Sequence, residues 1–188
     1  KEEHPENLFF KDKQNDKNII AFARKSEGYV EDEQAAFDEL VKSDKNMGKE
    51  TVNFGKFEKH PEYKARLYLA CLKFGMKMKN APEIEELKEY PEYKEIKRID
   101  LKSKLKTSRE AFNGSLETAK NDNDYINLRN DAETARKNFE TDNSDENKNA
   151  LENAEKALKG NKTYQDIEQK KKAYHNILKN AVDFYMKY

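Results

Sequence analysis

Apolar residues recur at intervals of three and four through the C-terminal half of this chain, between Pro91 and Tyr188. Because an α-helix completes a turn in about 3.6 residues, such intervals place these residues along one face of a helix. The pattern repeats in four consecutive segments with short connections, and it therefore predicts an antiparallel bundle of regular, heptad-like helices. The predicted seams, helix by helix, are Tyr93, Ile96, Leu101, Leu105, Ser108, Phe112 and Ala119; Tyr125, Leu128, Ala132, Ala135 and Phe139; Asn147, Leu151, Ala154 and Leu158; and Tyr164, Ile167, Lys171, Tyr174, Leu178, Ala181 and Tyr185.

The most apolar stretch of the chain, residues 60–80, precedes this regular half. It predicts a helix that begins at Pro61, because the first position of a helix needs no backbone N–H donor. The apolar face of this helix is wide, which is typical of a helix covered by neighbours on several sides. Its stripe contains Tyr63, Leu67, Cys71, Phe74 and Met78, and it is widened by Leu69, Leu72 and Met76.

The N-terminal segments are less regular. Residues 17–25 and 32–43 carry apolar residues at helical intervals, so each predicts a short helix. Residues 49–59, which contain Phe54 and Phe57, predict a loop. No segment alternates polar and apolar residues over enough positions to predict a strand.

These patterns together predict an all-α protein, an antiparallel bundle of about six to eight helices. We expect residues 1–15 to form a polar arm or tether and residues 16–188 to form a single helical domain. Within that domain, residues 16–90 form the irregular part and residues 91–188 the regular bundle, with the change of character near Tyr90.

Polar residues mark where the bundle helices begin. Asp122 or Asn123 is placed to cap the second helix of the bundle, and Ser144 or Asp145 the third. The residues from Thr163 to Asp166 are typical of a capping box at the start of the last helix.

The charge balance excludes some classes of protein. Thirty-seven basic residues match thirty-seven acidic ones, whereas a protein devoted to nucleic acid normally carries a basic excess.

No run approaches the roughly 18 consecutive apolar residues of a membrane span. The single cysteine, Cys71, cannot form a disulfide within the chain.

No residue pattern supports catalysis, a cofactor or a metal. Cys71 lies in the most apolar helix, where a thiolate is disfavoured and access is blocked. His4, His60 and His175 are far apart and have no second ligand at metal-binding spacing. The chain also lacks a nucleophile elbow, a phosphate-binding glycine loop and a dinucleotide fingerprint. We therefore expect no enzyme activity.

Two groups of residues in the last helix are candidates for binding a protein partner. The first is the basic run Lys170, Lys171 and Lys172, in which Lys171 occupies a seam position. It forms either a solvated face or the point at which the bundle opens to a partner. The second is Tyr185 with Tyr188, since tyrosine is enriched at interfaces; the same residues also suit the closure of the bundle end.

The composition resembles that of a known class of protein. The chain contains 31 Lys, 6 Arg and 19 Asn, and it begins at Lys1 with a polar segment that leads into short heptad-like helices. It is similar in these respects to the helical surface lipoproteins of spirochaetes and to surface or secreted binding modules of AT-rich Gram-positive bacteria. The resemblance implies display at the cell surface or secretion, a lipidated cysteine upstream of Lys1 as the only membrane attachment, and binding of a host protein.

The sequence thus favours a non-enzymatic helical binding module that engages a protein partner. The alternative is an intracellular scaffold or regulatory protein that assembles through its heptad seams.

Overall fold

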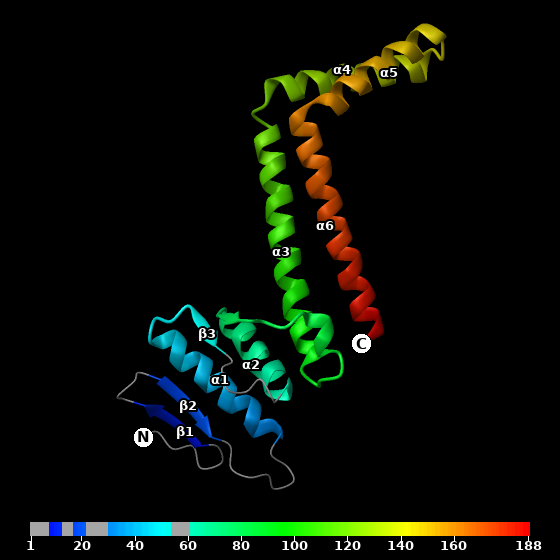
Figure 1. Ribbon diagram of the computed structural model, residues 1–188. Coiled ribbons are helices and arrows are strands. Elements are labelled where there is room, and N and C mark those ends of the chain that lie inside the picture. The colour runs from blue at the N-terminus through cyan, green and yellow to red at the C-terminus, as the bar shows by residue number, and fades with distance from the viewer. Residues whose placement is uncertain (1–7, 13–16, 22–29, 54–60) are drawn as a thin grey trace. The chain divides into compact units, whose positions relative to one another are not determined.

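The computed structural model describes residues 8–12, 17–21, 30–53 and 61–188 (Figure 1). The chain divides into two compact units, Lys1–Asp100 and Leu101–Tyr188. The boundary between them lies inside helix α3 (Tyr93–Ala119), beyond the change of character expected near Tyr90.

The first unit contains helices and four short strands in its described residues. Strand β1 (Leu8–Asp12) pairs antiparallel with β2 (Lys17–Ala21), and β3 (Thr51–Asn53) pairs parallel with β4 (Lys77–Lys79). Its helices are α1 (Val30–Asn46), α2 (Pro61–Phe74) and the single 3₁₀ turn η2 (Ile84–Leu87), followed by the start of α3.

The strands correct two predictions. The predicted helix over residues 17–25 is wrong, because Lys17–Ala21 is strand β2. The run there is too short for its period to separate helix from strand, and its adjacent β-branched residues, Ile19 and Ile20, favour the strand. The loop predicted over residues 49–59 contains β3, while Phe54 and Phe57 lie outside the described residues, as do residues 1–7 and 13–15 of the predicted arm.

Helix α2 begins at Pro61 as predicted, but it ends at Phe74 rather than continuing to residue 80. Gly75 has a φ of 67°, a left-handed conformation that terminates helices and that glycine adopts at little cost. Met78, which was expected on the helical stripe, lies in β4 instead. Its side chain is nevertheless buried in the same core.

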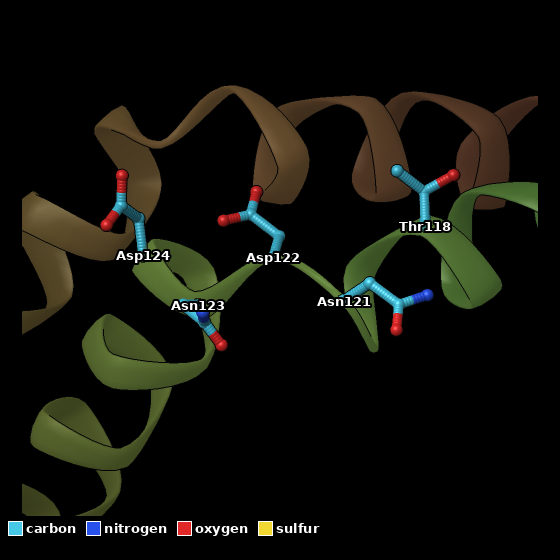
Figure 2. Close-up of a pocket in the computed structure, with 5 residues that line it drawn as sticks. All are labelled: Thr118, Asn121, Asp122, Asn123 and Asp124. Carbon is cyan, nitrogen blue, oxygen red and sulfur yellow. The ribbon is translucent and has the colours of Figure 1, made fainter.

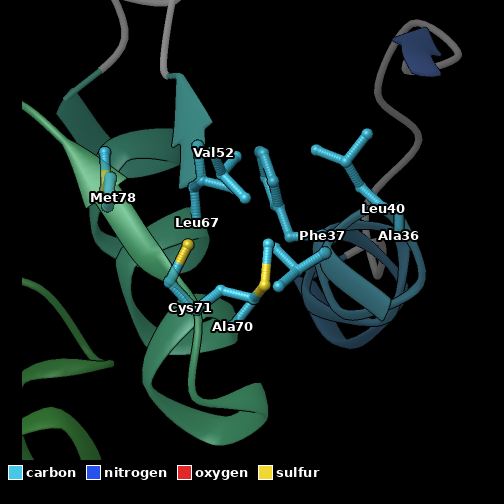
Figure 3. Packing of buried hydrophobic residues seen from close by; sticks show 10 residues of the cluster. Ala36, Phe37, Leu40, Val52, Leu67, Ala70, Cys71 and Met78 are labelled. Atoms are coloured by element: carbon cyan, nitrogen blue, oxygen red, sulfur yellow. The ribbon is translucent and has the colours of Figure 1, made fainter. Parts of the chain in front are cut away.

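The core of the first unit lies between α1, α2 and the small parallel sheet (Figure 3). The Phe37 side chain of α1 is completely buried, as is Ala70 of α2. The predicted enclosure of the 60–80 segment is therefore confirmed for α2. The cluster consists of Ala36, Phe37, Leu40, Val41, Val52, Leu67, Ala70, Cys71, Met76 and Met78, with Tyr63, Tyr68 and Phe74 packed against it.

The second unit is built from two antiparallel helix pairs (Figure 1). Helices α4 (Asn123–Thr141) and α5 (Asp145–Gly160) form a hairpin, joined across the pair by Arg136 and Glu155 at 2.9 Å. The second pair consists of α3 and α6 (Lys162–Lys187), where the Phe112 and Tyr174 rings stack with their centroids 6.3 Å apart. The predicted all-α fold with an antiparallel bundle is thus confirmed, with small strands added.

The predicted seams are right for three helices of the second unit and wrong for one. The seam residues predicted for α3 from Leu101 onward, and for α4 and α5, are buried or half-buried. In α6 the inward face is instead displaced by one residue at several positions, so that Lys171, Leu178 and Tyr185 are exposed. The inward residues of α6 are Ile167, Lys170, Tyr174, Ile177, Ala181 and Phe184.

The cause of this displacement is visible in the sequence of α6. The pairs Ile177–Leu178 and Phe184–Tyr185 give the helix two adjacent apolar stripes, both with intervals of three and four. Periodicity alone does not distinguish two such stripes. In the structure the first of them is half-buried at both pairs and the second is exposed.

Candidate functional site

Two surface features of the second unit are candidates for a site. The first is the corner where α3 gives way to α4, a shallow depression of about 650 Å³ (Figure 2). Asp122 caps α4 there, as predicted, by accepting a hydrogen bond from the backbone N–H of Tyr125 at 3.0 Å. The lining residues are Thr118, Asn121, Asp122, Asn123 and Asp124.

The Asp122 carboxylate also holds two helices together. The Thr163 hydroxyl of α6 donates a hydrogen bond to it, so Thr163 is not the start of a capping box. Asn161 caps α6 instead, accepting from the Tyr164 N–H at 3.1 Å. Ser144 caps α5 as predicted. The hydrogen bond from Thr163, followed by that from the Tyr125 N–H, lowers the pKa of Asp122 below its usual value of 3.8.

We predict a pH dependence from this carboxylate. A group whose pKa is lowered by folding adds stability above its unfolded pKa and loses it as the pH falls through its folded pKa. The advantage in melting temperature of the wild type over Asp122→Asn, which keeps a capping oxygen, should therefore shrink below about pH 3.8. Thermal melts between about pH 2 and 7 measure it.

Thr163→Val supplies the control for this prediction. It removes the largest cause of the pKa shift, so the loss of stability should move to higher pH than in the wild type. A difference between wild type and Asp122→Asn that stays constant with pH would contradict the assignment.

The side chains at this corner join two helices. Its lining contains carboxylates, amides and one hydroxyl but neither histidine nor cysteine. Among the residues that the structure describes, no group of His, Cys, Asp and Glu side chains could hold a metal ion. The contacts of Asp122 are those of a structural corner that joins α4 and α6.

The second candidate is the exposed side of α6. Five residues spaced by four, three, four and three follow one line of the helix and are all exposed; we call this line the α6 outer stripe. It consists of Lys171, His175, Leu178, Val182 and Tyr185. Val182 is 48% exposed and Tyr185 55%, and Met186, next to the stripe, is 84% exposed. Apolar side chains of this size are normally buried by preference.

The predicted lysine run is divided among different environments. Lys170 is half-buried on the inward face and its Nζ lies 2.8 Å from Asp166 Oδ2. Lys171 is exposed, not in the seam, and lies 3.4 Å from Glu168. Lys172 is exposed on the border of a depression of about 560 Å³ that adjoins the N-terminal end of the α6 outer stripe. The depression is lined by Glu168, Gln169, Lys171, Lys172, His175 and Asn176.

The two predicted tyrosines are both exposed and lie near the end of α6. Tyr185 belongs to the α6 outer stripe, and its ring meets that of Phe184 edge-on at 5.6 Å. The Tyr188 ring packs 5.1 Å from the same phenylalanine. The sequence prediction missed Leu178, Val182 and Met186 as surface residues. The sequence signal for them is the pair of adjacent apolar stripes on α6, because only one of these stripes can face inward and the other must remain exposed.

Cys71 is buried, as predicted. Burial first, and then the nearby charge of Asp44, raise the pKa of its thiol to about 12. Because the thiolate is the reactive form, we predict that iodoacetamide at pH 8 leaves Cys71 unmodified in the folded protein and modifies it fully in denaturant. Mass spectrometry measures the extent. Modification at similar rates in both states would show that the α2 core opens readily.

Comparison with known proteins adds no relative: no family model, curated protein or solved structure matches this chain. No helix in the described part of the chain is both long enough and apolar enough to cross a membrane.

Proposed function

We propose that this chain is a non-enzymatic helical binding module that engages a protein partner through the α6 outer stripe. The observation that carries the proposal is the group of large apolar side chains left exposed in the C-terminal part of α6 and at the residue that follows it: Leu178, Val182, Tyr185, Met186 and Tyr188. Single exposed apolar residues are common, whereas a contiguous group on one element is typical of an interaction site.

The chemistry of these residues suits a protein partner. Tyrosine and methionine are enriched at protein interfaces, where each supplies a large contact area. The helical intervals between Leu178, Val182 and Tyr185 match those at which a second helix packs its own side chains. Surface display or secretion, suggested by the composition, belongs to this proposal.

Assembly through the heptad seams is less well supported. The seams of α3, α4 and α5 are already covered within the second unit, since their residues are buried or half-buried there. The α6 outer stripe is not a seam in this structure, and it is therefore the surface that we assign to the partner.

A selection experiment tests the proposal. A displayed library of helical peptides is selected on the wild-type chain, and the enriched clones are measured against Val182→Asp/Tyr185→Asp. We expect the clones to bind this variant at least about tenfold more weakly, because charged groups at an apolar anchor remove the contact. Both positions are exposed, so its thermal stability should stay close to that of the wild type.

Ala173→Asp/Asn180→Asp is the matched control. It adds the same charge at two exposed positions, seven residues apart, on another line of α6. The clones should bind this variant as they bind the wild type. Clones that bind all three proteins equally would exclude the α6 outer stripe as the binding surface.

A further inference from the structure

We propose that the partner segment is an acidic amphipathic helix, which lies along the α3–α6 pair with its apolar side chains on the α6 outer stripe and its carboxylates over a row of cations on α3. This inference rests on the proposed function and specifies the partner's chemistry.

The position of the cations follows from the seam of α3. From Leu101 onward, the buried or half-buried residues of α3 are Leu101, Leu105, Ser108, Phe112, Ser115 and Ala119. The residues that directly follow them in the sequence are all exposed, and we call these the α3 outer row. The α3 outer row consists of Lys102, Lys106, Arg109, Asn113 and Leu116 of α3 and of Lys120, which directly follows the helix. Four of its six members are cations and none is acidic.

The α3 outer row and the α6 outer stripe lie on the same side of the helix pair. Lys171, His175, Leu178, Val182 and Tyr185 likewise each follow an inward residue of α6 by one position. In an α-helix each residue is rotated by about 100° from the preceding residue, and the sense of this rotation along the chain is the same in both helices. Helices α3 and α6 run antiparallel (Figure 1). Equal rotations away from the seam therefore bring both sets of residues to the same side of the pair.

The levels of the two helices also match. The Phe112 and Tyr174 rings stack, so these residues mark one level of the pair. The rise per residue is the same in both helices, so residues equally far along the chain from Phe112 and Tyr174 lie at the same height. Arg109 therefore lies beside Ile177 and Leu178, and Lys102 lies beside Phe184 and Tyr185. The exposed apolar residues of α6 are thus bordered by cations of α3.

Two of these cations have no counter-charge of their own. Lys106 and Lys120 lie 3.9 Å and 2.6 Å from Glu110 and Glu117, whereas Lys102 and Arg109 form no ion pair within the described part of the chain. Helix α6 also carries an excess of positive charge, since Lys162–Lys187 contains six lysines and three acidic residues, two of which pair with Lys170 and Lys171. Carboxylates of a partner complement this surface.

A second copy of the chain fits this surface poorly. Docking through the same side would bring a second α3 outer row into the interface, and that row has no carboxylate to neutralise the first. Like charges brought together across an interface disfavour the wrong partner.

Two synthetic helical peptides test the proposal by fluorescence anisotropy on the full chain. They share one leucine stripe and length, and their other positions are glutamate in one and lysine in the other. We expect the acidic peptide to bind at least about tenfold more tightly than the basic one, and to weaken as salt is added because salt screens exposed charges.

Charge-reversed variants locate the effect. Lys102→Glu/Arg109→Glu should weaken the acidic peptide about tenfold, since an attraction becomes a repulsion. Lys148→Glu/Lys156→Glu changes the net charge equally at exposed positions of α5 and should leave its affinity unchanged. Circular dichroism confirms that each variant is folded.

The contradicting results are distinct from failure of the proposed function. Equal affinity for the two peptides, preference for the basic one, no binding of either, or no effect of Lys102→Glu/Arg109→Glu would each overturn the acidic assignment. Selected clones that are neutral or basic but depend on Val182 and Tyr185 would preserve the binding function and overturn its acidic form.

Two further experiments test whether something other than an acidic helix occupies this surface. A dimer in light scattering that Val182→Asp/Tyr185→Asp abolishes would overturn the proposal in favour of self-association. Sedimentation with vesicles of equal phosphatidylserine and phosphatidylcholine, lost in the same variant, would overturn it in favour of an anionic membrane. A monomer that does not sediment with the vesicles, and that binds the acidic peptide as described, supports it.

Discussion

Replacing Phe37 by alanine is expected to lower the free energy of unfolding by about 3–5 kcal/mol. The Phe37 side chain is fully buried in the core of the first unit, where its ring centroid lies 5.9 Å from that of Tyr63. Removing the ring loses its apolar contacts and leaves a cavity that α1 and α2 fill only in part. Urea unfolding followed by circular dichroism measures the change.

Phe74→Ala is the matched control for this prediction. Phe74 packs against the same core at the end of α2 but is only half-buried, so the same truncation should cost clearly less. Equal losses from the two variants, or a loss below about 1 kcal/mol for Phe37→Ala, would contradict the packing between α1 and α2.

Removing Arg66 is expected to have an effect of similar size for a different reason. Its Nε lies 3.1 Å from Glu92 Oε1, and both side chains are only 10% exposed. Arg66→Ala leaves the Glu92 carboxylate buried without this partner, which typically costs about 3–5 kcal/mol. Replacing Glu92 by leucine in the same chain removes the isolated charge and should recover part of the loss. The four urea-unfolding curves of this double-mutant cycle measure the coupling.

The exposed pair Lys42–Glu39, 3.6 Å apart, is the reference for that cycle. Its side chains are about half exposed, and its coupling should not exceed about 0.5 kcal/mol. If the losses in the free energy of unfolding from Arg66→Ala and Glu92→Leu simply add, the coupling energy is zero. The ion pair between α2 and the start of α3 then contributes nothing to stability.

The sequence was most informative where one face of a helix is clearly apolar. In α4 and α5 a single stripe of intervals of three and four is available, and its residues are the ones that pack. In α6 two adjacent stripes are available, and only the folded structure shows that Ile177 is half-buried and Leu178 exposed. The two parallel strands Thr51–Asn53 and Lys77–Lys79 are too short for a period to be read, and their pairing depends on segments far apart in the chain.

The candidate site was predicted only in part. Tyr185 was named from its residue type, and it does lie on the α6 outer stripe. The sequence predicts Leu178 in the seam. It does not predict the position of the α3 cations beside α6, because that position depends on which stripe of α6 faces inward. The capping of α6 by Asn161 was missed because Thr163 has the spacing of a capping box while its hydroxyl is used by Asp122.

Site-specific cross-linking tests the central claim most directly, namely that the α6 outer stripe is the surface that a partner helix contacts. A benzophenone amino acid is placed at position 182 in one protein and at position 180, on the other line of α6, in a second. The partner is a peptide selected on the wild-type chain. We predict that it becomes linked to the protein labelled at position 182 and not to the one labelled at position 180. Equal linkage at both positions, or linkage at position 180 alone, would contradict the claim.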